Sequence, residues 1–428
     1  MSEHVHDGVY DVVVLGGGPA GSAAALALVQ VRPELRVLLV EASAFERWRI
    51  GETLAPGGRR LLDGLGVWER VRAAGALECF GTSAVWGGED RYDNEFVFSA
   101  RGNAWHVDRT AFDAALVACA QERGVEVWRD ARFVAGARAG DRWLLTIARG
   151  GVERCAVARG GEERGAVVRG GEERGAVVRG GEETCAVEAS VVIDATGRNA
   201  CFASRQGAGR IVDDRLAGVA VRFRAPDDVR DATTLVEAQE DGWWYSAAIP
   251  GGRIIVAWMS DADLIRRDAL KEPARWLARL GVSRETRARL RACVPEWPAG
   301  IWSARSQRLA QVCGERWLAV GDAASAFDPL SSAGVLKGLY TGKIGAFAVL
   351  DLLRGDSSGL ERYRAHVERE YAAYLKTRAV FYALEQRWPQ AEFWRRRHGD
   401  AAHAAARSTL SRPADSAGWR QAAREAAG

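Results

Sequence analysis

The sequence is poor in cysteine and lacks long apolar runs. Its seven cysteines are scattered over 428 residues, and their spacing is typical neither of a metal site nor of a disulfide scaffold. No run approaches the roughly eighteen apolar residues of a membrane helix, and the first ten residues carry acids and histidines where a secretory signal would be basic and apolar. We therefore expect a cytoplasmic protein with no metal site and no membrane contact.

Lysine is also scarce, because only four of the 59 basic residues are lysines and the first of them is Lys271. The net charge of +3 is nearly balanced and gives no reason to expect a nucleic-acid partner. With 48% hydrophobic and 27% charged residues, the composition is that of a globular protein. The length predicts two or three domains.

A glycine turn near the start organises the rest of the chain. The apolar residues 12–15 indicate a strand, the letters GGGPAG follow at 16–21, and residues 22–30 have an Ala-rich helical pattern. Such a turn lets a pyrophosphate approach the backbone and the N–H groups that open the helix. A plain connection between strand and helix is the alternative. The predicted dinucleotide contacts in this segment are Gly16, Gly18, Ala20 and Gly21.

A carboxylate after the next strand narrows the choice of ligand. Residues 37–40 are apolar, and Glu41, followed by Ala42, lies about twenty residues beyond the glycines. An acidic side chain at this place binds both ribose hydroxyls and repels a 2′-phosphate. We therefore expect a dinucleotide without that phosphate, with Glu41 and Ala42 among its contacts. A solvated strand end is the alternative for Glu41.

Two neighbouring arginines are suited to contact the phosphates or the ring of a dinucleotide cofactor. Arg47 and Arg49 precede a Gly-Glu-Thr turn and a helix expected at 57–65, and plain surface charges are their alternative role. Arg109 opens a helical pattern that Asp108 or Thr110 caps. On its own, this position suits an ion pair of Arg109 with Asp113, four residues further along the helix.

Two later strands end in small turns of the same kind. The strand at 191–193 leads into Asp-Ala-Thr-Gly, and the strand at 317–320 leads into Gly-Asp. A Pro-Leu-Ser-Ser-Ala-Gly run then opens a helix whose N–H groups suit an electron-rich ring. No second GxGxxG follows a strand, so we expect no separate nicotinamide-binding domain. The candidate contacts in these turns are Thr196, Gly197, Gly321, Asp322, Pro329, Ser332 and Gly334.

Residues 149–187 contain a ten-residue repeat, with copies that begin at Arg149, Arg159, Arg169 and Arg179. Each copy joins a Gly-Gly turn to a short piece with strand propensity. One apolar pair per copy buries little surface. We interpret the repeat as an expanded loop between two strands, and a ligand-binding repeat is the alternative.

Residues 211–310 alternate between short apolar strands and turns. The strand at 242–249 places Trp243 and Tyr245 on one face and Trp244 on the other. One face suits a core and the other an aromatic substrate cavity, with pure packing as the alternative. The candidate substrate-lining residues are Trp243, Tyr245, Glu52 and Asp328.

The segment from residue 351 onward is predicted to be helical, and Tyr363, Tyr371 and Tyr374 are spaced to cover a domain junction. A basic and aromatic cluster lies at 387–398. It is suited to dock an acidic partner, and a solvated arginine face is the alternative.

In their order along the chain, these motifs resemble those of flavin-dependent halogenases and related flavoprotein monooxygenases with the fold of p-hydroxybenzoate hydroxylase. Phe-x-Arg-x-x-Ile-Gly-Glu at 45–52, Asp-Arg-x-x-Phe-Asp at 108–113 and Asp-x-Thr-Gly at 194–197 carry the resemblance. It implies FAD as the cofactor, with Arg109 against FAD and Asp322 on the ribityl chain. It also implies an α/β fold: a Rossmann-like, glutathione-reductase-type FAD domain, an antiparallel β-sheet substrate domain and C-terminal helices.

Domain boundaries follow from this expected fold. The FAD-binding domain takes residues 1–88, 107–148, 188–210 and 311–350, and the repeat insertion takes 149–187. The β-rich substrate domain takes 89–106 and 211–310, and the helical C-terminal region takes 351–428.

Departures from the halogenase pattern bear on the reaction. A halogenase needs a lysine between the glycine turn and the substrate domain to hold hypohalous acid, and none occurs before Lys271. Ser331 stands where tryptophan halogenases carry a Glu, and Tyr245 begins a segment in which they have Trp-x-Trp-x-Ile-Pro. The segments GETL, GWWYS, RWP and FWRRRH look instead like those of halogenase-like flavoproteins that oxygenate a Trp of a partner protein and so mature the cysteine tryptophylquinone cofactor.

The resulting hypothesis is an FAD-dependent monooxygenase that activates O₂ at reduced flavin and hydroxylates an indole- or Trp-like aromatic substrate. That substrate is a small molecule or a Trp of a partner polypeptide, and a separate flavin reductase is a candidate electron source. One alternative is a flavin-dependent halogenase or an FAD-dependent reductase of the same fold. The other is a flavin-binding assembly factor without turnover. The sequence identifies no catalytic acid or base.

Overall fold

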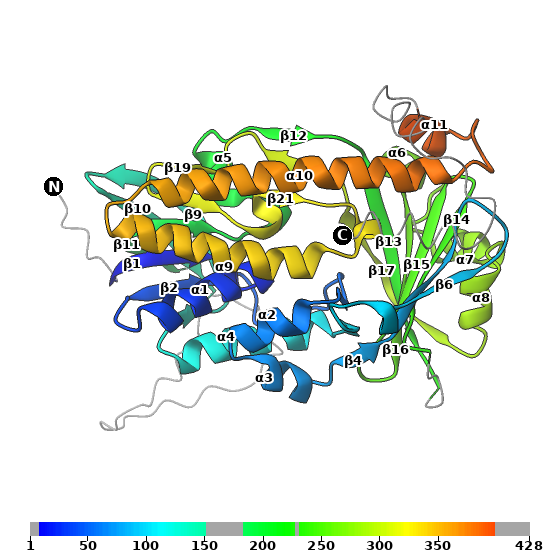
Figure 1. Ribbon diagram of the computed structural model, residues 1–428, viewed down its shortest axis with the longest axis horizontal. Helices are drawn as coiled ribbons and strands as arrows, with labels where there is room; N and C mark the ends of the chain where they lie inside the picture. The colour runs from blue at the N-terminus through cyan, green and yellow to red at the C-terminus, as the bar shows by residue number, and fades with distance from the viewer. Residues whose placement is uncertain (1–7, 151–182, 227–230, 399–428) are drawn as a thin grey trace, which may run out of the picture.

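The computed structural model describes residues 8–150, 183–226 and 231–398. Two large sheets lie toward opposite ends of the long axis of the molecule, and long helices run beside them (Figure 1). No helix in these ranges is both long and apolar enough to cross a membrane.

The first sheet has eight strands within the described ranges, and its central path runs β19-β20-β11-β1-β2-β8. β1 pairs in parallel with β2 on one side and with β11 on the other. Parallel strands buried on both faces are near-continuously apolar, and residues 12–15 and 37–40 are all buried. The strands are β1 (Gly8–Leu15), β2 (Val37–Val40), β8 (Glu126–Trp128), β9 (Ala131–Ala139), β10 (Arg142–Arg149), β11 (Glu183–Asp194), β19 (Cys313–Gly314) and β20 (Trp317–Ala319).

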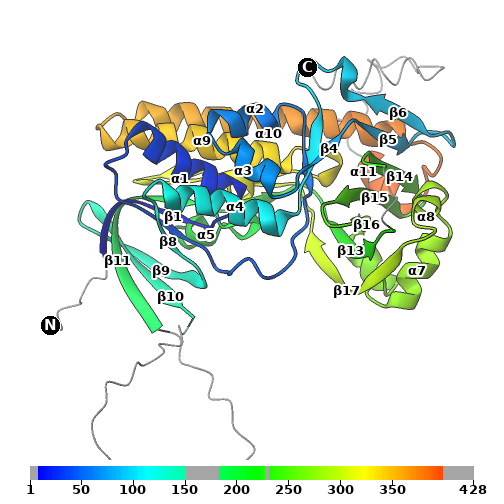
Figure 2. The same ribbon diagram turned by 90° about the horizontal axis from the view of Figure 1, so that it is seen from below.

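Helices α1 (Pro19–Val31), α4 (Arg109–Glu122) and α9 (Gly334–Leu353) pack together beside this sheet (Figure 2). Small residues let the backbones of α1 and α9 approach closely, since a Cβ on Gly342 would lie 2.1 Å from the carbonyl oxygen of Ala20. Helix α1 begins three residues before the predicted start at Ser22, because a proline fits the first helical turn.

The second sheet has seven strands in the order β17-β13-β16-β15-β14-β5-β6. Its pairings are antiparallel except for β14 with β5, and α6 (Ala262–Arg267), α7 (Pro273–Gly281) and α8 (Glu285–Arg289) accompany it. β5 lies in the range predicted for the FAD domain, so we move that boundary to precede residue 81. The strands are β5 (Gly81–Val85), β6 (Tyr92–Glu95), β13 (Leu216–Arg224), β14 (Thr234–Gln239), β15 (Gly242–Ile249), β16 (Arg253–Asp261) and β17 (Val294–Ser303).

Two small sheets and several short helices complete the described chain. One sheet consists of β3 (Thr53–Leu54), β4 (Leu77–Cys79) and β7 (Ala104–His106), and the other of β12 (Arg210–Val212), β18 (Gln307–Leu309) and β21 (Ser325–Ala326). The remaining helices are α2 (Gly58–Gly64), α3 (Trp68–Ala73), α5 (Cys201–Arg205), α10 (Ser358–Leu384) and α11 (Glu392–His398), with 3-10 turns at Phe96–Phe98, Gly197–Asn199, Gly321–Ala323 and Pro329–Ser331.

Helix α10 extends from the first sheet to the second (Figures 1 and 2). Near its start, the Tyr363 hydroxyl donates to the carbonyl of Ala319 in β20 at 2.7 Å. Near its end, the Tyr382 hydroxyl accepts from Nε1 of Trp243 in β15 at 3.1 Å. The contact of Tyr363 agrees with the prediction that tyrosines of this helix cover a junction, whereas Tyr382 was not among the predicted residues.

The predicted repeat insertion lies largely outside the described residues, at 151–182. The strands on either side of it, β10 and β11, pair antiparallel with Arg149 opposite Glu183. The repeat therefore connects adjacent ends of neighbouring strands, and its interpretation as an expanded loop stays a prediction.

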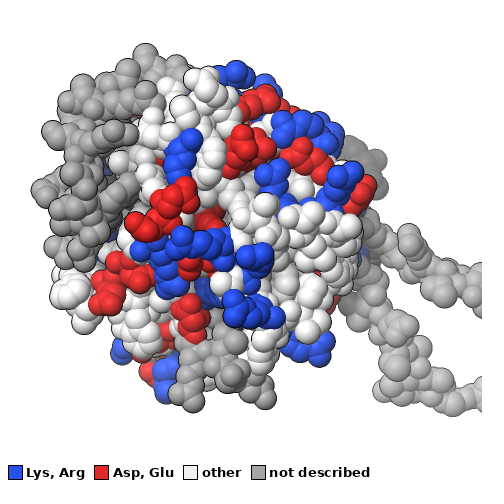
Figure 3. All heavy atoms as spheres, turned by 90° about the vertical axis from the view of Figure 1, so that its right-hand side faces the viewer, with Lys and Arg blue, Asp and Glu red and all other residues white. Residues whose placement is uncertain are grey.

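Part of the basic and aromatic cluster at 387–398 is internal, which leaves less of it for the predicted docking face. Phe393 and Trp394 are fully buried, and Arg397 pairs with the buried Asp261 at 2.8 Å. Acidic side chains lie beside the basic ones on the face of the molecule shown in Figure 3. We therefore no longer expect this cluster to bind an acidic partner.

Candidate cofactor and substrate site

A cavity of about 740 Å³ brings together most of the predicted site residues. Its size lies within the range usual for ligand pockets. Residues of both large sheets line it, together with the turns that follow β1, β11 and β20. The predicted cofactor contacts that line it are Gly16, Gly18, Ala20, Glu41, Ala42, Arg49, Arg109, Thr196, Gly197, Gly321, Asp322, Pro329, Ser332 and Gly334, and the predicted substrate contacts are Tyr245, Glu52 and Asp328.

The glycines of the first turn have different physical roles. Gly16 has a φ of +111°, and a Cβ on Gly21 would lie 1.9 Å from the carbonyl oxygen of Gly16. Both glycines are therefore required by the packing of the turn. A Cβ on Gly18 would meet nothing within 4 Å, so the space above it is open to the cavity. Free space at the N-terminus of α1 suits a pyrophosphate.

A buried charge network forms the wall beside this turn. Glu41 accepts a hydrogen bond from the backbone N–H of Gly17 at 2.7 Å through Oε2, and its Oε1 pairs with Arg49 at 2.7 Å. Arg49 also pairs with the buried Asp113 at 2.9 Å, and Arg109 pairs with the same carboxylate at 3.0 Å. The ion pair considered as the alternative role of Arg109 is therefore present, and Arg109 lines the cavity as well.

Asp322 lies at the far side of the same region. Its carboxylate pairs with Lys337 at 2.9 Å and with Arg198 at 3.5 Å. Although burial raises the pKa of Asp322, these two cations leave it below its usual value. An ionised carboxylate at this place is suited to accept hydrogen bonds from hydroxyl groups of a ligand.

Three predicted contacts do not line the cavity. The Arg47 side chain is 90% exposed and lies 3.7 Å from Glu46, so the surface role is the correct one for it. Gly21 does not face the cavity, and its lack of a side chain lets α1 pack against the carbonyl of Gly16. Trp243 is fully buried and packs edge to face against Trp86 at 6.3 Å, so the prediction that it lines the substrate cavity is wrong.

The end of the cavity at the seven-stranded sheet is mostly apolar. Gly218 and Ala220 of β13, with Ala257 of β16, leave space there because their side chains are small. The polar groups at this end include the Tyr245 hydroxyl, which lies 3.0 Å from Oγ1 of Thr53 and donates to Oε2 of Glu52 at 3.3 Å.

Glu52 is 2% exposed, and its Oε1 has no hydrogen-bond partner among the described residues. Burial raises the pKa of Glu52 to about 7, although the nearby Arg109 and the bond from Tyr245 act in the opposite direction. Burial also raises the pKa of Tyr245 well above its usual value, and the Glu52 carboxylate adds to this effect. At neutral pH, Glu52 can therefore hold or release a proton while Tyr245 stays protonated.

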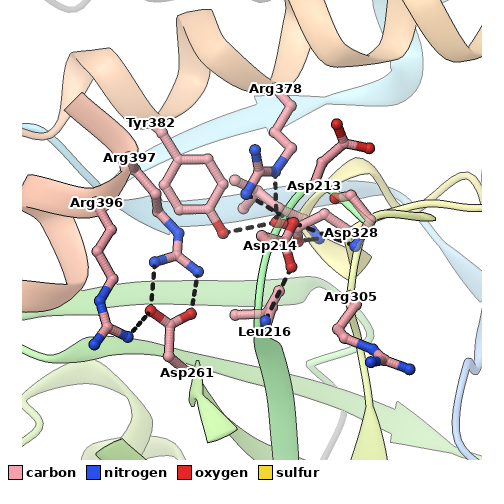
Figure 4. Close-up of polar contacts among 12 residues, drawn as sticks. Asp213, Asp214, Leu216, Asp261, Arg305, Asp328, Arg378, Tyr382, Arg396 and Arg397 are labelled. Carbon is pink, nitrogen blue, oxygen red and sulfur yellow. Dashed lines mark hydrogen bonds and ion pairs between the residues drawn. The ribbon is translucent and has the colours of Figure 1, made fainter. Parts of the chain in front are cut away.

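Asp328 lines the cavity, and its carboxylate contacts side chains of α10 (Figure 4). Tyr382 donates to Oδ2 of Asp328 at 2.7 Å, and Arg378 lies 3.4 Å from the same atom. Both partners belong to α10, and the sequence analysis missed them, as it missed the cavity residue Trp302. Only the alternation of small residues along β13 offered a sequence signal for the cavity wall.

Comparisons with known proteins agree with this geometry. Residues 11–103 match the tryptophan halogenase family. The FAD-dependent oxidoreductase LodB of Marinomonas mediterranea is 27% identical over 92% of this chain and 98% of its own length. The halogenase CmlS has a crystal structure with a TM-score of 0.78 and 25% identity, over 97% of this chain and 72% of that one.

The chain is similar to flavin-dependent halogenases in part of its sequence and in its fold. Its predicted fold class is confirmed, and the predicted FAD cofactor and the class of FAD-dependent oxidoreductases agree with these relatives. Other relatives in sequence are chiefly halogenases, including a pyrrolyl carrier-protein chlorinase. The comparisons thus favour the halogenase alternative over hydroxylation.

One halogenase-like neighbour in structure acts on a protein side chain. It is the peptidyl tryptophan dihydroxylase QhpG, essential for tryptophylquinone cofactor biogenesis, with a TM-score of 0.64 and 22% identity over 91% of this chain and 78% of that one. At this identity the likeness concerns the fold. A specific relationship to tryptophylquinone maturation stays a prediction.

Proposed function

We propose that this protein is an FAD-dependent monooxygenase that hydroxylates an electron-rich, indole-like aromatic ring. The observation that carries the proposal is the apolar end of the cavity, which holds a carboxylate and a phenol and which no lysine lines. All four lysines of the chain lie in the described ranges. Lys337, which pairs with Asp322, is buried.

The residues present fit FAD. The open space above Gly18 at the start of α1 suits the pyrophosphate, and Glu41 suits the ribose of the adenosine. Asp322 suits the hydroxyls of the ribityl chain, and the segment from Pro329 to Gly334 suits an edge of the flavin ring. Reduced FAD, when bound, supplies the reaction with O₂.

The chain itself orients the aromatic substrate and excludes water. The small side chains of β13 and β16 leave room for a ring beside Tyr245, and Trp302 packs edge to face on Trp48 at 4.7 Å beside this end. An apolar site limits the access of water to the reacting groups. The substrate is a small aromatic molecule or a Trp side chain of a partner polypeptide, and the likeness to the QhpG fold supports the second choice.

Halogenation is the second candidate, because halogenases predominate among the relatives. It requires a lysine that holds hypohalous acid between flavin and substrate. Lys337 donates to Asp322 and to the carbonyl of Ser325, so it is not free to do so in this structure.

The deciding experiment mixes reduced, FAD-loaded protein with O₂ in the presence of indole or of a Trp-containing peptide, with and without chloride or bromide. We expect a product that has gained oxygen whether or not halide is present. A product that carries a halogen only when halide is present would establish the halogenase instead. Reoxidation at the rate of free flavin, with no product from either substrate, would favour an assembly factor without turnover.

A further inference from the structure

Glu52 presents a buried acceptor atom that the protein leaves without a donor. The residue precedes β3, lines the cavity and is 2% exposed. Oε2 accepts the hydrogen bond from Tyr245, whereas Oε1 has no partner among the described residues. Burying a carboxylate oxygen without a donor is costly, so such an atom is expected to receive its donor from a ligand.

The side chains around Glu52 do not supply that donor, although the backbone N–H groups of Gly51 and Glu52 lie close enough to lower its pKa. Arg109 of α4 is the charged side chain that faces it, and the guanidinium of Arg109 is bound to Asp113 and to the carbonyl of Ile50. The Tyr245 hydroxyl has a single proton, and its neighbours are Oγ1 of Thr53 and Oε2 of Glu52. It therefore does not donate to Oε1. The strand opposite Tyr245 contributes Ala257, which is apolar.

We propose that Oε1 of Glu52 binds the ring N–H or O–H of the aromatic substrate and accepts its proton during the reaction. The identity of the substrate as an electron-rich aromatic rests on the proposed function. In this step the N–H or O–H bond breaks, its electron pair stays on the ring heteroatom, and a new O–H bond forms at Oε1. No electrons are gained or lost in the transfer, and the more electron-rich ring is the better nucleophile.

Tyr245 is the positioning residue in this arrangement. Its hydroxyl binds Oε2, which leaves Oε1 as the buried oxygen of Glu52 without a partner among the described residues. A carboxyl group whose pKa is raised to about 7 by burial is also suited to exchange protons near neutral pH. The charged and titratable groups that face it are Arg109 and Tyr245, and both oppose the effect of burial on this pKa.

The test measures binding without turnover, in the oxidised, FAD-loaded protein. Indole and 1-methylindole are titrated separately, and binding is followed by the change in the flavin absorption spectrum. The two ligands differ in the N–H donor. Variants Glu52→Gln, Glu52→Leu and Tyr245→Phe are compared with wild type, and Glu69→Gln serves as the matched control because Glu69 is exposed on α3.

In wild type and in Glu69→Gln, we expect indole to bind roughly ten- to a hundredfold more tightly than 1-methylindole above neutral pH, which is the usual strength of a hydrogen bond to a charged group. The preference should decrease as the pH falls below about 7 and Glu52 becomes protonated. Glu52→Leu should abolish it. Glu52→Gln should retain a weaker preference that does not depend on pH, and Tyr245→Phe should move the pH at which the preference is lost.

A preference of the same size in Glu52→Leu, or none in wild type, would overturn the proposal. The flavin spectrum of each variant shows whether the protein has folded and bound FAD. Because no turnover is involved, a preference that depends on Glu52 in a protein that forms no oxygenated product would remove the proposed function and keep the binding role of Glu52. Normal formation of the oxygenated product without a preference for indole would remove the binding role of Glu52 and keep the proposed function.

Discussion

Replacing Glu52 by Gln should stabilise the flavin-free protein by an amount that grows with pH. The folded protein raises the pKa of Glu52 from 4.5 to about 7 because the carboxyl group is buried. That difference corresponds to about 3 kcal/mol. Below pH 4.5 the group is protonated in both the folded and the unfolded chain, so its ionisation does not change the free energy of unfolding there.

As the pH rises from 4.5 to about 7, the unfolded chain releases this proton while the folded chain keeps it. The wild type therefore loses stability through this window, and the full penalty applies above it. A glutamine does not ionise, so the variant escapes the penalty. Any fixed cost of the buried amide is the same at every pH and does not change the slope.

The assay is the thermal unfolding midpoint of both proteins, followed by tryptophan fluorescence at several pH values. For a chain of this length, 1 kcal/mol corresponds to about 1 °C. The midpoint of Glu52→Gln relative to wild type should therefore rise by about 3 °C between pH about 4.5 and about 8. Glu69→Gln should show a constant difference from wild type. Parallel curves for Glu52→Gln and wild type would mean that Glu52 ionises normally, and the reasoning about a buried, donor-free carboxylate would be refuted.

Three further predictions test the cofactor end and the helical junction. Gly18→Ala should leave the thermal midpoint of the flavin-free protein unchanged and weaken FAD binding at least roughly tenfold in a flavin titration. Gly21→Ala should instead lower the free energy of unfolding by about 2 kcal/mol, because its Cβ would meet a carbonyl oxygen. Arg49→Ala should lower the free energy of unfolding by about 2 kcal/mol, because the buried carboxylates of Glu41 and Asp113 lose a positive partner. Arg47→Ala should change the thermal midpoint by less than about 0.5 °C. Equal effects of the two variants would contradict the placement of Arg49 in the wall and Arg47 at the surface. Asp261→Ala should lower the free energy of unfolding by about 3 kcal/mol in urea, because it removes the carboxylate that pairs with the buried Arg397 of α11. An unchanged free energy of unfolding would show that the junction tolerates the charge of Arg397.

The cofactor end of the cavity could be predicted from the sequence because its geometry is local. A strand, a glycine turn and a helix follow one another within about twenty residues, and the order of these elements determines where Gly16, Gly18 and Glu41 lie. The turns after β11 and β20 end parallel strands of the same sheet, so their residues meet at one edge of it. Fourteen of the predicted cofactor contacts line the cavity, and most of them lie in these turns.

The substrate end could not be predicted in the same way. The alternation along β15 correctly places Trp243 and Tyr245 on one face, but it does not say which element covers each residue. Trp243 is covered by Tyr382, 139 residues further along the chain, whereas Tyr245 faces the cavity. Likewise, Arg47 and Arg49 are two residues apart, and the positions of Glu41 and Asp113 decide that Arg49 is the one held in the wall.

The sequence by itself determined the dinucleotide site, the two-sheet α/β fold and the kinship with flavin-dependent enzymes, because these depend on short segments whose backbone geometry is set by neighbouring residues. The tertiary structure alone decided that Glu52 keeps one oxygen without a donor and that Phe393, Trp394 and Arg397 pack inside. Burial and the pairing of charges depend on which distant segments meet, and that is settled only when the whole chain has packed.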